Sequence, residues 1–144
     1  MIDAVHVLPS LYGHILIPPA VYRELTTPTA PEKVRLWFQD RPSWIEIREL
    51  SGAVGQDLAD FLDAGESEAI QLAKELQADL LLIDELAGRK LAIENGLRVI
   101  GLIGVLATAA QKALIDPEIA IKQIERTNFY ISEDLIEFLR SSSK

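Results

Sequence analysis

The stretch from Leu80 to Gly101, LLLIDELAGRKLAIENGLRVIG, decides the fold. Its first four residues form an uninterrupted apolar run that ends at Asp84, and a second segment with the apolar residues Leu97, Val99 and Ile100 follows at residues 97–100. Short continuous runs of this kind are typical of strands buried on both faces of a parallel sheet. Residues 85–95 between them favour a helix that stops at an Asn-Gly pair. The stretch therefore predicts a strand–helix–strand unit with parallel strands.

The same alternation of strands and helices continues on both sides of this unit. Pro19 suits the first turn of a helix, and Asp63 with Glu66 has the spacing of a capping box. Strands joined by helices imply right-handed crossovers, so we predict an α/β fold with a parallel sheet between helices. The expected strands are 14–17, 44–48, 80–83 and 97–100, and the expected helices are 1–11, 19–25, 31–39, one after Asp63, 85–95, one reaching residue 114, 116–126 and 132–140.

Length and composition indicate one folded domain. The 144 residues are 49% hydrophobic, enough to build a core, and we expect a single domain over residues 1–144 with a disordered tail at 141–144. Without cysteine there is neither a disulfide framework nor a thiolate metal site. No apolar run reaches the roughly 20 residues of a membrane helix, and no signal peptide is recognisable. We therefore expect a cytoplasmic protein that does not contact a membrane.

The net charge of −8 bears on the partner. Proteins that bind nucleic acids usually carry a basic surface, because phosphate contacts supply much of their affinity. Charge alone therefore argues against a nucleic-acid partner. An acidic nuclease stays possible if the surplus carboxylates gather around a metal ion, since a bound cation inverts the local field.

Four acidic residues are candidates for such a metal site: Glu24, Glu66, Glu68 and Asp84. In parallel α/β sheets the chemistry lies at the carboxyl ends of the strands, which is where Asp84 stands. Clustered carboxylates repel one another and stay ionised only beside a cation. Mg²⁺ and Mn²⁺ prefer such oxygen ligands, and a metal held this way can activate water and neutralise charge on a phosphodiester.

Each candidate also has a purely structural interpretation. Asp84 could be a helix N-cap, Glu66 could only complete the capping box, and Glu68 could be a solvated acid of the first helical turn. Glu24 could be a plain surface acid. Arg89 and Lys90, one turn beyond Asp84, could contact phosphate or could lie on a solvated helix face.

Other kinds of site are not supported. The two histidines, His6 and His14, lack the spacing of a zinc site, and no serine stands in the setting of an acyl-transfer nucleophile. The glycines Gly101 and Gly104 form neither a dinucleotide-binding fingerprint nor a phosphate-binding loop, and they suit close packing of helices instead.

Four segments in order resemble PIN-like proteins related to type II toxin nucleases. They are IPPAVYREL at 17–25, DAGESEAI at 63–70, LLLIDELAGRKLA at 80–92 and VIGLIGVL at 99–106. The resemblance covers about residues 11–114 and implies a three-layer α/β/α sandwich with a central parallel sheet. It also implies RNA cleavage that depends on Mg²⁺ or Mn²⁺, and inhibition by a small antitoxin protein.

The resemblance assigns roles to the candidate acids. Glu24 matches the helix acid after the Ile-Pro turn, and Asp84 matches the acid that ends the buried strand. The middle acid is Glu66 or Glu68, with a slight preference for Glu68, because it precedes the apolar part of the helix as the family's usual acid does. The implied catalytic set is Glu24, Glu68 and Asp84, and Glu66 joins them as a possible metal ligand.

One departure from the family affects the expected activity. The family begins with a strand that ends in an Asp, whereas residues 1–11 resemble the helix after that strand, and Asp3 is a poor substitute. We therefore expect an N-terminally incomplete domain with little nuclease activity, and a homodimer that covers the exposed sheet edge. The alternatives are a non-catalytic PIN-like binding module and a phosphoacceptor domain that uses Asp84, although acids near a first strand are not found.

Overall fold

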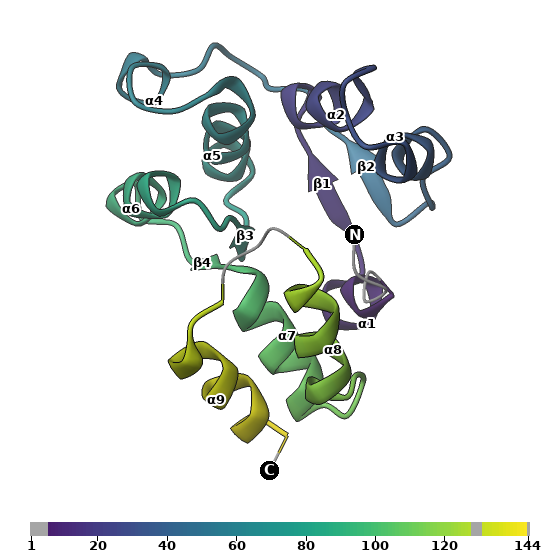
Figure 1. Ribbon diagram of the computed structural model, residues 1–144. Helices are drawn as coiled ribbons and strands as arrows, with labels where there is room; N and C mark the ends of the chain where they lie inside the picture. Colours follow the sequence, from purple (N-terminus) through teal and green to yellow (C-terminus); the bar gives the residue numbers. More distant parts are fainter. Residues whose placement is uncertain (1–5, 128–130, 144) are drawn as a thin grey trace. The chain divides into compact units, whose positions relative to one another are not determined.

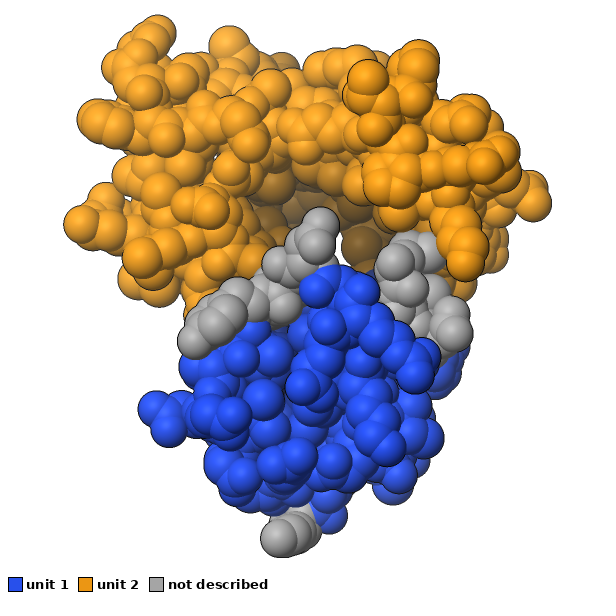
Figure 2. Space-filling view, viewed as in Figure 1, with its two compact units in different colours: residues 1–13, 101–144 blue, residues 14–100 orange. Residues whose placement is uncertain are grey.

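The computed structural model describes residues 6–127 and 131–143 (Figure 1). The chain divides into two compact units, one of residues 14–100 and one formed by the two segments that flank it (Figure 2). Every candidate acid belongs to the unit of residues 14–100. Whether the chain behaves as one domain, as the sequence predicts, stays a prediction.

The unit of residues 14–100 alternates strands and helices as the sequence predicts. Its elements are β1 (Ile15–Ile17), α2 (Pro19–Thr26), α3 (Glu32–Gln39), β2 (Ile45–Ile47), α4 (Gln56–Ala59), α5 (Ala64–Leu76), β3 (Leu81–Leu82), α6 (Leu86–Glu94) and β4 (Val99–Ile100). Pro19 occupies the first turn of α2. The helix α6 is flanked by the caps Glu85 and Asn95, so the predicted range of 85–95 is confirmed.

The strands pair in parallel, which confirms the central prediction of the sequence. β3 pairs with β4, Leu81 opposite Val99, and α6 crosses between them. β1 pairs with β2, Ile15 opposite Ile45. Within the described residues these are two separate two-stranded sheets. The α/β class therefore holds, while the single central sheet of a three-layer sandwich stays a prediction.

The burial expected for residues 80–83 was wrong in one respect. Leu81 and Ile83 pack against the buried cluster of Leu58, Ile70 and Ala92, but Leu82 is 40% exposed. Successive side chains of a strand point to opposite faces of its sheet. The strand therefore buries one face within its unit, although its uninterrupted apolar run predicted burial of both.

The second unit is helical in its described part. It contains α1 (Val7–Tyr12), α7 (Leu102–Gln111), α8 (Pro117–Glu125) and α9 (Glu133–Ser141). α7 ends before the predicted residue 114, because Ala113 takes a left-handed conformation with a φ of 57°. Of the helix predicted at residues 1–11, the first five residues lie outside the described part of the chain. The core here joins α7, α8 and α9 through Ile103, Leu106, Ala107, Ala120, Ile121, Ile124, Ile136 and Leu139.

None of the helices described here is both long enough and apolar enough to span a membrane.

The core assignment makes a first testable prediction. Ile70 is completely buried, whereas Ile93 is 58% exposed. Ile70→Ala should lower the free energy of unfolding by about 2–5 kcal/mol, because it removes apolar contacts and leaves a cavity. Ile93→Ala should change it by less than about 0.5 kcal/mol. Urea unfolding of both variants measures the difference, and equal losses would show that the core is assigned incorrectly.

Candidate active site

Two glutamates each cap the helix on which the other one stands. Glu24 in α2 accepts a hydrogen bond from the Gly65 N–H in the first turn of α5, at 3.1 Å. Glu68 in α5 accepts one from the Ala20 N–H in the first turn of α2, at 3.0 Å. The first N–H groups of a helix have no partner within the helix and favour negative charge. The two carboxylates therefore join α2 and α5 by reciprocal capping.

Glu68 is held by contacts at both of its oxygens. Its Oε1 receives the Ala20 N–H, and its Oε2 lies 3.7 Å from Nη2 of Arg23. Its side chain is 19% exposed. These contacts give Glu68 a structural role. That Glu68 is the middle catalytic acid stays a prediction.

Glu66 differs from Glu68 in its surroundings. Its backbone N–H donates to Oδ1 of Asp63 at 2.9 Å, which confirms Asp63 as the N-cap of α5. Its carboxylate atom Oε2 is buried and has no hydrogen-bond partner among the described residues. A buried polar atom without a partner is costly, so such an atom needs a physical or functional reason.

Several acidic side chains lie close enough to Glu66 to raise its pKa. Burial, followed by a hydrogen bond with the Asp63 side chain and repulsion from Asp63, Glu85 and Glu24, raises the pKa of Glu66 to about 7. Each of these causes disfavours the ionised carboxylate. Glu24, Asp63, Glu66 and Glu85 therefore form an acidic cluster, which is built from α2, the start of α5 and the start of α6.

Asp84 lies at the carboxyl end of β3, as the sequence predicts. The Ile83 N–H before it donates to the Ile100 carbonyl at 2.9 Å and extends the β3–β4 pairing. The interpretation of Asp84 as a helix N-cap was wrong, because the N-cap of α6 is Glu85, whose Oε1 accepts from Ala87 N–H at 3.4 Å. Asp84 is exposed.

The two candidate phosphate-binding residues follow on α6. Arg89 is half-buried and Lys90 is exposed. The Arg89 N–H donates to the Glu85 carbonyl at 2.9 Å, so the two residues stand one turn beyond the acidic cluster. Their contact with phosphate stays a prediction.

The acidic cluster was only partly visible in the sequence. Asp63 was expected solely as a helix cap and Glu85 was not a candidate, and both raise the pKa of Glu66. The signal that could have found them is their position at the starts of the two helices that flank β3 in the sequence. Asp3, the weak substitute for a first Asp, lies outside the described residues.

The residues provide the right donor chemistry for a divalent metal but not a preformed set of ligands. Carboxylate oxygens suit Mg²⁺ and Mn²⁺, and Glu66 Oε2 has no other partner in the described chain. However, no group of three or more His, Asp or Glu among residues 6–127 and 131–143 is arranged to hold a metal ion. A metal here would need the carboxylates to move together.

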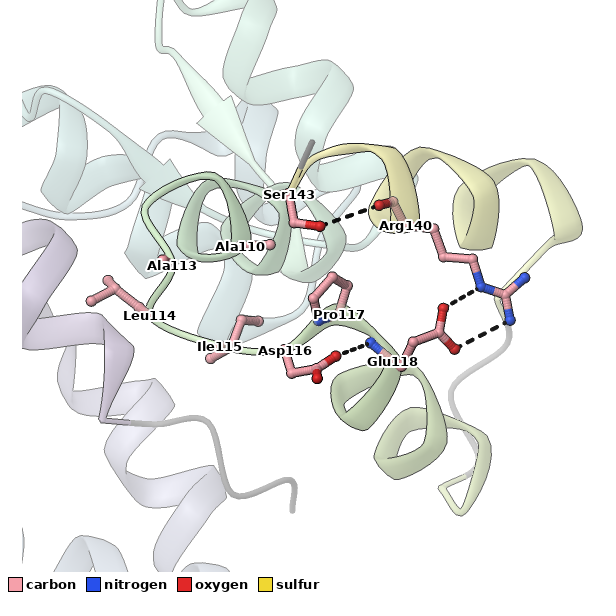
Figure 3. A pocket seen from close by; sticks show the side chains of 9 residues that line it. All are labelled: Ala110, Ala113, Leu114, Ile115, Asp116, Pro117, Glu118, Arg140 and Ser143. Carbon is pink, nitrogen blue, oxygen red and sulfur yellow. Dashed lines mark hydrogen bonds and ion pairs between the residues drawn. The ribbon is translucent and has the colours of Figure 1, made fainter.

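A separate pocket lies in the helical unit, away from these acids in the sequence. Its volume is about 700 Å³, and the residues that line it include Asp116, Glu118 and Arg140 (Figure 3). Arg140 already pairs with Glu118 at 2.6 Å and with Glu137 at 3.2 Å. None of the predicted site residues lines this pocket.

A comparison with protein families decides the class of the chain. The model of the family DUF3368, a PIN domain, matches residues 1–144. The chain belongs to this family. No curated protein and no solved structure matches it. The predicted resemblance to PIN-like proteins is therefore confirmed, and the acidic cluster belongs to a PIN domain.

The raised pKa of Glu66 predicts how the stability of this PIN domain depends on pH. The pKa is about 7 in the folded chain against an ordinary value of 4.5. The folded state thus binds the extra proton between these values, and stability falls as the pH rises through that window. Glu66→Gln should remove this fall. Because solvent screens a partly exposed group, we expect a gain of about 1 kcal/mol at pH 8 and none below pH 4.

Chemical unfolding between pH 4 and pH 8 measures this difference. Glu94→Gln removes the same charge from an exposed position at the end of α6, and it serves as the control. If both variants showed the same pH profile as the unmodified chain, the acidic cluster would not be coupled as described.

Proposed function

We propose that this PIN domain is a divalent-metal-dependent ribonuclease whose site combines the acidic cluster around Glu66 with Asp84 after β3. The observation that carries the proposal is the buried, unpartnered Oε2 of Glu66 beside Glu24, Asp63 and Glu85. Such a cluster is unfavourable without a cation, and a bound Mg²⁺ or Mn²⁺ would compensate it. Membership of the PIN-domain family supports the assignment, because clustered acids are what the family resemblance implies.

The proposed ligands are Glu24, Glu66 and Asp84, which stand on α2, on α5 and after β3. A metal bound there would supply a polarised water and would neutralise charge on a phosphodiester. Glu68 would act as a positioning residue, because it fixes α2 relative to α5 through Ala20. Arg89 and Lys90 would attract the RNA phosphates toward the cluster.

Titration with Mn²⁺ and an RNA-cleavage assay test this proposal. Glu66→Gln and Asp84→Asn should each weaken Mn²⁺ binding at least about 10-fold and reduce cleavage of single-stranded RNA accordingly. Glu94→Gln should leave both unchanged, because Glu94 is exposed at the end of α6. Cleavage that persists with a chelator, or that survives both substitutions, would contradict the proposal.

A non-catalytic PIN-like binding module is the second candidate. The observation in its favour is that the carboxylates within the described residues do not form a group ready to hold a metal. An oxygen of Glu24 also already serves as a cap of α5. The two candidates differ in the titration, since the binding module predicts no saturable Mn²⁺ binding at all.

The biological setting implied by the family resemblance extends the same proposal. We propose a toxin-type nuclease that a small antitoxin protein inhibits, and that self-associates. Support for self-association comes from the sheets, because each pair of described strands leaves outer edges that proteins usually pair or cover. Light scattering that reports only monomer at high concentration would exclude the homodimer.

A further inference from the structure

We propose that Gly65 and Gly88 are positioning residues of this site, because the missing Cβ of each leaves the space that a carboxylate occupies. Gly65 makes room for Glu24, and Gly88 makes room for Glu66. What the carboxylates do rests on the proposed function. Their placement by the two glycines does not rest on it.

Backbone conformation does not explain either glycine. Neither has a positive φ, in contrast to Gly13 and Gly96. Both lie in the first turn of a helix, Gly65 in α5 and Gly88 in α6. Glycine is a poorer helix former than alanine, so its use at both positions needs another physical reason.

The space around Gly65 is taken by Glu24. A Cβ on Gly65 would lie 2.5 Å from Oε1 and 2.8 Å from Oε2 of Glu24, far closer than such atoms can approach. The same Oε1 accepts the Gly65 N–H at 3.1 Å. The glycine thus allows the Glu24 carboxylate to lie directly against the backbone at the start of α5.

The space around Gly88 is taken by Glu66 and Ile83. A Cβ on Gly88 would lie 2.6 Å from Oε2 of Glu66 and 2.6 Å from Cδ1 of Ile83. This Oε2 is the buried carboxylate atom that has no hydrogen-bond partner in the described chain. Gly88 therefore lets the start of α6 pass closely beside the central carboxylate of the cluster.

The contacts at the two glycines predict which side chains alanine would displace. At Gly65 a new Cβ would meet the end of the Glu24 side chain, and at Gly88 it would meet the end of Glu66 and the apolar side chain of Ile83. Alanine favours the helix, which offsets part of the lost Glu24 cap and of the disturbed Ile83 contact. We therefore expect each substitution to disturb the site while the chain still folds. A glycine that only serves packing would lower stability without affecting Mn²⁺ binding.

The experiment compares Gly65→Ala and Gly88→Ala with the control Gly52→Ala, where a Cβ would meet nothing closer than 4.0 Å. Both site variants should weaken Mn²⁺ binding at least about 10-fold, and both should still unfold cooperatively. The control should bind Mn²⁺ normally. In Gly65→Ala the amide proton of residue 65 should also exchange at least about 10-fold faster, because it loses its Glu24 acceptor.

Shorter carboxylates test the steric cause directly. Glu24→Asp added to Gly65→Ala, and Glu66→Asp added to Gly88→Ala, should recover part of the Mn²⁺ affinity, because each shortens the displaced side chain by one methylene. Ile83→Val added to Gly88→Ala should not recover it, since this change relieves only the apolar contact. Recovery with Ile83→Val alone would show that Gly88 serves packing and would overturn the assignment for that residue.

Two readouts do not depend on the proposed function. If the unmodified chain binds no Mn²⁺, the metal proposal fails, but amide exchange at residue 65 still tests Gly65. For Gly88 the alternative is a double-mutant cycle with Glu66→Ala, in which Gly88→Ala should be less unfavourable for the Tm than it is when Glu66 is present, because the displaced carboxylate is gone. Unchanged exchange together with additive Tm values would overturn the inference.

Discussion

The reciprocal capping of α2 and α5 is the interaction on which the rest of this unit depends. Glu24 caps α5 and Glu68 caps α2, across sequence separations of 41 and 48 residues. Pro19 contributes to this arrangement, because it has no N–H and the Ala20 N–H is therefore the first donor inside α2. Hydrogen bonds between charged carboxylates and backbone N–H groups are stronger than neutral ones, and here they are partly buried. They fix where α5 begins and hence where Glu66 lies.

The position of Glu66 follows from this constraint and carries an energetic cost. Because α5 starts at Ala64, its third residue is Glu66, whose carboxylate lies against Gly88 in the first turn of α6. The carboxylate of Glu85 repels it there. Three acidic neighbours and partial burial hold its pKa near 7. Strongly perturbed acids of this kind are characteristic of functional sites, where charge is concentrated for a task rather than for stability. The chain belongs to the PIN-domain family, and a concentration of acidic side chains is what the proposed metal site requires.

The local features of the chain were predictable, and its long-range features were not. The run ending at Asp84, the helix to Asn95 and the cap at Asp63 were read correctly, because each depends on neighbours in sequence. Only a slight preference for Glu68 over Glu66 was possible, since residues two apart on a helix face different directions and their surroundings depend on the partner helices. The exposure of Leu82 and the separation of the two strand pairs likewise depend on contacts that no local pattern encodes.

The central claim is that Glu66 lies within a group of carboxylates that a cation would relieve. Carbon-13 NMR of the glutamate side chains, followed from pH 4 to pH 9 without and with Mg²⁺, measures this most directly. The carboxyl of Glu66 should titrate near 7 without the metal and at clearly lower pH when Mg²⁺ is saturating. An ordinary titration near 4.5, or a midpoint near 7 that Mg²⁺ does not move, would contradict it.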